Sequence, residues 1–164
     1  MSTRSAIAWY DPALKTGMSV YCHWDGYPSG VGRTLLDYYN DESRVKRLVS
    51  LGDLSYVEKF IDPEEYAKVH NAKSNEIHAH SFDRPWPNVT VAYGRDRGED
   101  NVDAHVWNNV DSVSDLLSSM EKHYDWSEFL YVYDVVSGKW VVRCAGDSNC
   151  VPLEEAIEEN EHLE

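Results

Sequence analysis

The segment from Tyr21 to Asn40 constrains the fold most, because within it the hydrophobic pattern changes from that of a strand to that of a helix. Residues 18–24 alternate between apolar and polar types, the period of a β-strand with one buried face. Three glycines and a proline follow and predict a loop. Apolar residues then return at helical spacing through residues 31–39. The segment therefore predicts a strand, a tight loop and a helix in succession, with the core side of the strand formed by Met18, Val20, Cys22 and Trp24.

The remaining strand patterns fall into pairs. Residues 3–10 form an apolar run that ends at the turn signal Asp11-Pro12, so they predict a hairpin with residues 18–24. A second hairpin is expected between residues 88–93 and 102–107, across a charged turn at 94–100, and residues 77–82 could add a strand. The third hairpin joins residues 129–135 to 139–144 through Ser137-Gly138.

Helices are expected between these pairs. A stripe of Val45, Leu48 and Val49 ends at Gly52 and predicts a helix over residues 41–49. Asp62 and Pro63 supply an N-cap and a first helical position for a helix reaching about His70. Three further helical segments are expected: a short turn over 56–61, residues 112–124 with Val113, Leu116, Leu117 and Met120 facing inward, and residues 152–159.

This order predicts an α+β fold in which hairpins form one antiparallel sheet and helices pack mainly on one face. A chain of 164 residues with 42% hydrophobic residues is expected to form a single domain with a sizeable core. We assign residues 1–152 to that domain. Residues 153–164 contain six glutamates and no lysine or arginine, and predict an acidic helix end that frays.

The net charge of −14 argues against direct nucleic-acid binding, which needs clustered lysine and arginine. The negative charge is compatible with binding of a basic partner and with mimicry of nucleic acid. A simpler interpretation is that the charge only maintains solubility. Six tryptophans and eleven tyrosines are typical of contact surfaces and half-buried strands. The sequence shows no signal peptide, no apolar run of membrane-spanning length and an odd number of cysteines without zinc spacing, so we expect a reducing cytoplasmic location and no membrane association.

His23 and Asp25 are the first candidate catalytic residues. Two residues apart on a strand, they could share a face, and a carboxylate beside an imidazole orients it and raises its pKa, which suits a general base. Alternatively, His23 is an exposed strand-end residue and Asp25 opens the turn at residues 25–28. Cys22 would be a nucleophile only if it were exposed near a positive group; alternation predicts that it is buried.

The glycines at 26, 30 and 32 precede a helix, as they do in phosphate-binding loops, but no Lys-Ser/Thr pair follows them. Arg33 and Thr34 could hold an anion at the start of the helix. The alternative is a tight strand-to-helix turn in which the glycines adopt positive φ.

A candidate metal pair is formed by His78 and His80, which would project from one face of a strand, with His70 and Asp83 nearby in sequence. Two histidines do not complete a zinc site, and we predict no metal or other cofactor.

A charged turn is expected to contain Arg95, Asp96, Arg97 and Glu99. The two guanidinium groups could bind a phosphate or carboxylate ligand. Alternatively, the turn is a hairpin tip whose charges neutralise one another.

Three stretches, YCHWDGYPSGVGRTLL, LVSLGDLS and AYGRDRGED, together with the opening MSTRSAIA, resemble a group of small uncharacterised proteins encoded by bacteriophages and prophages. The resemblance ends near Asp100. It implies a phage or prophage origin and a cytoplasmic accessory role, and it implies no reaction.

Two functional hypotheses follow. The first is an accessory protein that binds a host or phage macromolecule, foremost a protein, through an acidic, aromatic-rich surface. The second is a small enzyme or ligand-binding protein for an anionic substrate. Its site would combine the HWDG and RDRGE motifs, with arginines for charge and His23 or Asp25 for proton transfer.

Overall fold

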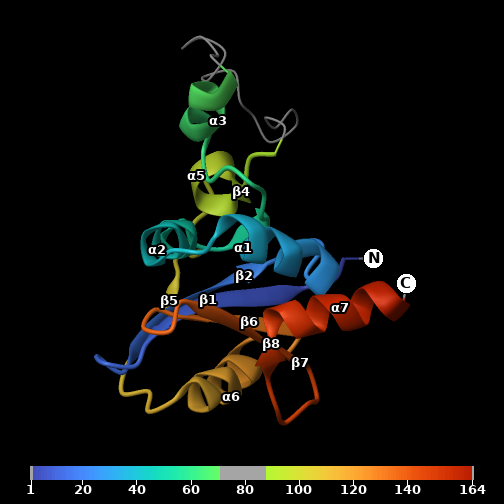
Figure 1. Cartoon of the computed structure of the whole chain (residues 1–164). Coiled ribbons are helices and arrows are strands. Elements are labelled where there is room, and N and C mark those ends of the chain that lie inside the picture. Colours follow the sequence, from blue (N-terminus) through green and yellow to red (C-terminus); the bar gives the residue numbers. More distant parts are fainter. Residues whose placement is uncertain (1, 71–87, 164) are drawn as a thin grey trace.

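The computed structural model describes residues 2–70 and 88–163, which form an α+β domain around one eight-stranded sheet (Figure 1). The strand order is β4-β3-β2-β1-β6-β7-β8, and β5 also pairs with β2. The strands are β1 (Ser5–Asp11), β2 (Thr16–Cys22), β3 (Leu54–Tyr56), β4 (Val91–Ala92), β5 (His105–Trp107), β6 (Phe129–Asp134), β7 (Lys139–Cys144) and β8 (Val151–Pro152). The helices are the π-helix η1 (Pro28–Gly32) and the α-helices α1 (Arg33–Tyr38), α2 (Glu42–Ser50), α3 (Pro63–His70), α5 (Tyr93–Arg97), α6 (Val113–His123) and α7 (Leu153–Leu163).

The sheet is mixed, which corrects the expectation of a purely antiparallel one. β1–β2 and β6–β7 are antiparallel hairpins, as predicted, but the two hairpins join through parallel pairing of β1 with β6. β2 and β3 are also parallel. The chain between them contains η1, α1 and α2, and a helical crossover of this kind is what parallel neighbours require.

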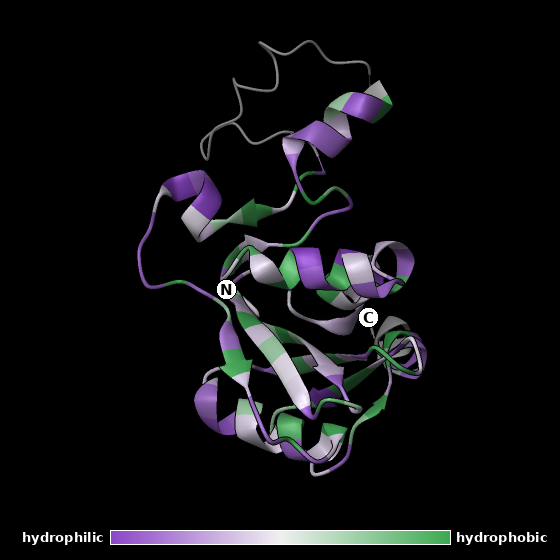
Figure 2. Ribbon diagram, turned by 90° about the vertical axis from the view of Figure 1, so that its left-hand side faces the viewer, coloured by the Kyte–Doolittle hydropathy of each residue, from purple (hydrophilic) through white to green (hydrophobic). Residues whose placement is uncertain are grey.

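Helices lie on both faces of the sheet, most of them on one face as expected and α6 on the other (Figures 1 and 2). Alternation in β1 explains this, because its residues supply two cores. Ile7 belongs to the larger core, with side chains from η1, α1, α2 and α7, whereas Ala6, Ala8 and Tyr10 face α6. The α6 side chains in that second core are Leu116, Leu117 and Met120, as the helical pattern predicts.

Residues 54–107 depart most from the sequence-based expectations. The predicted second hairpin is wrong, because β4 pairs with β3 whereas β5 pairs with β2. The predicted short helix at 56–61 is also wrong: β3 ends at Tyr56, and residues 57–61 are not helical. The charged turn is instead the helix α5, closed by Gly98 at φ +65°. α2 and α3 form where their patterns place them, and Asp62 caps α3 by accepting a hydrogen bond from the Glu65 backbone N–H at 2.9 Å.

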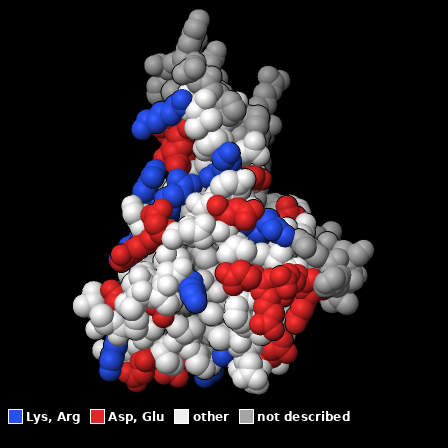
Figure 3. Space-filling model, viewed as in Figure 1, with Lys and Arg blue, Asp and Glu red and all other residues white. Residues whose placement is uncertain are grey.

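The acidic α7 begins within the domain, because Leu153, Ala156 and Ile157 are buried in the larger core. Its glutamates Glu154, Glu155, Glu158 and Glu159 are exposed. Figure 3 shows acidic side chains gathered over α7 and basic side chains gathered on the side of α2 and α3. On the face that this view shows, the largest acidic cluster is therefore separate from the basic one.

Across the described residues, we find no helix of the length and apolarity needed to cross a membrane.

Candidate functional site

An unbroken series of ring contacts joins eight aromatic and histidine side chains along one part of the surface. We call it the aromatic row. Neighbouring ring centroids along it lie 4.3–5.8 Å apart, and most neighbours are edge-to-face, a favoured arrangement for aromatic pairs. In order, the rings are Trp24, His23, Tyr21, Trp126, Tyr124, His123, His105 and Trp107.

Strand periodicity and pairing position the row. In β5, His105 and Trp107 are two residues apart and so lie on one face of the strand, beside Ser19 and Gly17 of β2. The Trp107 indole N–H donates to Ser19 Oγ at 2.8 Å, and Ser19 Oγ is 2.7 Å from Tyr124 Oη. The end of α6 thus connects to β2 and β5 through hydrogen bonds as well as ring contacts.

The row combines anchored and exposed rings. Tyr124 is 5% exposed, and burial raises its pKa to about 12 despite its hydrogen bond to Ser19. By contrast, Trp24 and Trp126 are each 43% exposed. Alternation had predicted Trp24 in the core; that prediction is wrong because β2 ends at Cys22 and the chain turns at Asp25, whose φ is +56°. The row therefore offers two exposed indoles on a rigid base.

His23 and Asp25 lie close in sequence, but no hydrogen bond or ion pair joins them. His23 Nδ1 instead shares a short hydrogen bond with Tyr21 Oη. Burial, together with the positive charges of Arg4 and Arg97, lowers the pKa of His23. Asp25 is exposed and accepts from the Tyr27 hydroxyl at 3.4 Å. The lowered pKa favours the neutral form of the His23 ring at neutral pH.

Cys22 is fully buried, as alternation predicts, and burial raises its pKa to about 12. A thiol in this state is not a nucleophile near neutral pH.

None of the loop glycines at 26, 30 and 32 adopts positive φ, so the expected turn geometry is wrong. Two of them are needed because a side chain at their positions would collide with the backbone of a neighbouring segment. A Cβ on Gly26 would lie 2.8 Å from the Thr3 carbonyl oxygen, and one on Gly30 would lie 2.4 Å from that of Asp25. The loop borders a pocket of about 230 Å³ that brings Asp25, Arg33 and Glu58 together. Burial, and secondarily the charge of Asp25, raise the pKa of Glu58.

The residues of the RDRGE motif divide between two roles. Arg95 donates to the carbonyl oxygens of Ile61 at 2.8 Å and Thr90 at 2.7 Å, and it pairs with Asp96. The Asp96 carboxylate accepts from the Ala92 backbone N–H at 2.8 Å. These two residues therefore hold the chain around β4.

Arg97 stacks over the Tyr93 ring at 4.7 Å and pairs with Glu99 at 3.7 Å. Its charge also contributes to the lowered pKa of His23, so the HWDG and RDRGE segments are neighbours on the molecule. The pocket that holds Asp25 and Arg33, however, is lined by no residue of RDRGE.

His78, His80 and Asp83 lie outside the described residues. Within residues 2–70 and 88–163, no group of three or more His, Cys, Asp or Glu side chains is arranged to hold a metal ion.

No protein-family model matches the chain, and comparisons with curated proteins and with solved structures find no significant match.

Sequence reasoning missed most of the aromatic row. Its rings come from segments about a hundred residues apart, and periodicity within a segment carries no information about such contacts. The excess of tryptophan and tyrosine was the only available signal.

Proposed function

We propose that this protein is a binding protein that docks a partner protein on the aromatic row. The exposure of Trp24 and Trp126 within one continuous series of ring contacts carries the proposal. A phage or prophage origin and a cytoplasmic accessory role, implied by the sequence resemblance, are part of the same proposal.

The physical argument is that the exposed indoles are already ordered before binding. Trp126 packs against Tyr21 at 4.4 Å, and Trp24 packs against His23 at 4.7 Å. Immobilising a free side chain on association costs about 0.5–1.5 kcal/mol, and much of that cost is avoided here. Tryptophan and tyrosine are also the residues most enriched among those that dominate binding energy at interfaces.

Charge favours a partner that presents basic residues. The protein carries a net charge of −14, and the exposed acids Asp25 and Asp125 directly adjoin Trp24 and Trp126 in sequence. An arginine or lysine of the partner could stack on an indole face and lie near one of these carboxylates. Long-range attraction to the acidic surface would also accelerate association.

An anionic ligand bound jointly by HWDG and RDRGE has less support. The guanidinium group of Arg95 is already bonded to two backbone carbonyls and a carboxylate.

A retention experiment tests the proposal. The immobilised wild type is exposed to a bacterial host lysate beside the double variant Trp24→Ala/Trp126→Ala. The matched control is Leu14→Ala/Val136→Ala, which removes two apolar side chains that are each 70% exposed and lie outside the row. Circular dichroism verifies that all three proteins are folded.

We expect a stoichiometric partner to bind the wild type and the control, and to bind the tryptophan double variant at least about tenfold more weakly. Equal retention by all three proteins, or the lack of any stoichiometric partner on the wild type, would contradict the proposal.

A further inference from the structure

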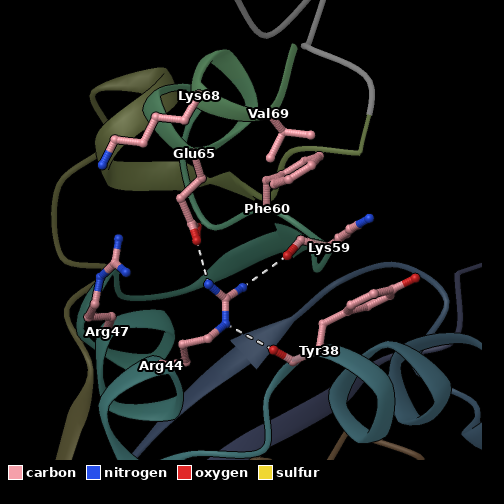
Figure 4. A pocket seen from close by; sticks show the side chains of 8 residues that line it. All are labelled: Tyr38, Arg44, Arg47, Lys59, Phe60, Glu65, Lys68 and Val69. Atoms are coloured by element: carbon pink, nitrogen blue, oxygen red, sulfur yellow. Dashed lines mark hydrogen bonds and ion pairs between the residues drawn. The ribbon is translucent and has the colours of Figure 1, made fainter. Parts of the chain in front are cut away.

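We propose that a second site, separate from the aromatic row and independent of its function, binds a small organic anion with an aromatic body and a phosphate or carboxylate group. The site is a pocket of about 480 Å³ between α2, α3 and the chain at Lys59, which we call the α2–α3 pocket (Figure 4). Its lining consists of Tyr38, Arg44, Arg47, Lys59, Phe60, Glu65, Lys68 and Val69.

The lining is cationic on an acidic protein. Among the described residues it contains four basic side chains and one carboxylate, whereas the whole chain has 15 basic and 29 acidic residues. Figure 3 shows the same contrast, with basic side chains gathered on the side of the molecule where α2 and α3 lie. Such a local excess of positive charge in a concave site favours an anion.

The floor of the pocket is ordered by its own ion pair. The Arg44 guanidinium donates to the carbonyl oxygens of Tyr38 at 2.9 Å and Lys59 at 3.0 Å, and it forms a short ion pair with Glu65. The second carboxylate oxygen of Glu65 accepts from the Ile61 backbone N–H at 2.9 Å. Because Arg44 offsets the carboxylate of Glu65, the remaining cations of the described lining are Arg47, Lys59 and Lys68.

Two of those three cations have no carboxylate partner within the part of the chain that the structure describes. They are Lys59 and Lys68; Arg47 pairs with Asp62 at 3.0 Å through one guanidinium nitrogen. The remaining donors of Arg47 are available for a ligand, since a guanidinium carries five N–H groups. Figure 4 shows Arg47 and Lys68 on the same side of the Arg44–Glu65 pair. Both could contact a phosphate monoester, Lys68 through its ammonium and Arg47 through the N–H groups that Asp62 does not use.

The opposite side of the pocket carries three apolar side chains together with Lys59, whose ammonium lies 5.4 Å from the ring centroids of both Tyr38 and Phe60. Figure 4 shows Tyr38, Phe60 and Val69 on the other side of the ion pair. Tyr38 is 41% exposed and Val69 is 62% exposed, so both present uncovered apolar surface. A ligand whose anionic group lies between Arg47 and Lys68 would place its aromatic body on this surface. The volume is within the range of about 300–1,000 Å³ that small-molecule sites occupy.

Calorimetric titration with phenyl phosphate tests the proposal, with benzoate and phenol as comparison ligands. Phenyl phosphate supplies both the ring and a dianion, benzoate supplies a monoanion and phenol supplies the ring alone. The test variant is Arg47→Gln/Lys68→Gln. The control variant, Lys122→Gln/Lys139→Gln, makes the same change in net charge at exposed residues of α6 and β7 that do not line the pocket.

We expect phenyl phosphate to bind the wild type and the control with similar Kd, and to bind the test variant at least about tenfold more weakly. Benzoate should bind more weakly than phenyl phosphate, and phenol should not bind measurably. Equal Kd in the test and control variants would show general charge attraction and overturn the site. Binding of phenol as tight as that of phenyl phosphate would overturn the role of the cations, and no binding of phenyl phosphate at about 5 mM would overturn the proposal as a whole.

Discussion

The central sheet and the flanking unit of this protein are held together differently. The central sheet comprises β1, β2, β6 and β7, whose strands pair along their full length. The flanking unit comprises residues 54–70 and 88–97, which include β3, α3, β4 and α5. There, β3 and β4 pair at two positions with a register shift, and one isolated bridge joins Phe60 to Val89. Backbone pairing alone therefore holds the flanking unit weakly.

Polar side chains replace the missing backbone pairs in the flanking unit. Arg95 binds the carbonyls of Ile61 and Thr90, and Asp96 binds the N–H of Ala92. Thr90 Oγ1, fully buried, accepts from the Glu58 backbone N–H at 2.9 Å. Burial of apolar area is spread over many side chains, whereas these bonds depend on single groups. The two regions should therefore respond differently to substitution.

The largest expected effect comes from the core of the central sheet. Trp140 is 2% exposed, and its indole N–H donates to the Tyr39 carbonyl oxygen at 2.8 Å. We expect Trp140→Ala to lower the free energy of unfolding by about 4 kcal/mol, because it creates a large cavity and leaves that carbonyl unpaired. Denaturant unfolding measures the change. Val136→Ala, at a residue 70% exposed in the adjoining turn, should change stability by less than about 0.5 kcal/mol.

Hydrogen exchange should show that the Trp140→Ala loss is global, with protection falling in both regions. A loss confined to the central sheet would mean that the flanking unit folds independently of it.

The second effect is local to the flanking unit. Arg95→Ala leaves two backbone carbonyls without their donor, and we expect a loss of about 2–3 kcal/mol. Amide exchange should accelerate around Ile61 and β4 well before it does in β1 or β6. Arg97→Ala is the matched control, since it removes an arginine from the same helix and leaves the Arg95 bonds in place. Equal acceleration of exchange across both regions would refute the distinction.

The same contrast explains how much of the fold could be predicted from sequence. The β1–β2 and β6–β7 hairpins were predicted correctly because each strand pairs with its neighbour in the chain across a short turn. β5 was predicted to pair with residues 88–93, the nearest strand pattern. It pairs with β2 instead, where Trp107 bonds Ser19 across 88 positions of sequence. Local periodicity cannot choose between such partners.

The sites follow the same rule. Burial of Cys22 followed from alternation within one strand. The role of Arg95 depends on two carbonyls whose positions only the tertiary fold sets, so the motif could not distinguish a ligand-binding arginine from a structural one. Neither the aromatic row nor the α2–α3 pocket is contiguous in sequence, because both depend on how the tertiary fold places the helices and strands.

The smallest expected effect is a difference in pH dependence between the two regions. Glu58, in the flanking unit, has a pKa raised above 4.5 chiefly by burial, with a second contribution from Asp25. His105, in the aromatic row beside β2, has a pKa lowered below 6.5 chiefly by burial, with a second contribution from His123. The folded protein therefore binds more protons than the unfolded chain at Glu58 and fewer at His105. By linkage, the raised pKa of Glu58 lowers the free energy of unfolding at pH values above that pKa, and this loss disappears on acidification. The lowered pKa of His105 lowers the free energy of unfolding only as the pH falls below 6.5.

Single variants should separate the two signs. Relative to the wild type, the free energy of unfolding of Glu58→Gln should rise most at pH 7. The rise should disappear toward pH 4.5, the ordinary pKa of a glutamate. Loss of the His105 titration should leave the free energy of unfolding of His105→Gln unchanged at pH 7.5 and raise it progressively below pH 6.5. We expect each pH-dependent change to remain below about 1 kcal/mol, because both side chains are partly exposed and solvent screens their charges.

Urea unfolding from pH 7.5 to 4.5 measures the differences in free energy of unfolding between each variant and the wild type. Only the slopes of these differences against pH matter, since lost packing shifts each curve by a constant. Parallel slopes for the two variants would mean that burial does not set these protonation equilibria in opposite directions, and the electrostatic part of the comparison would fail.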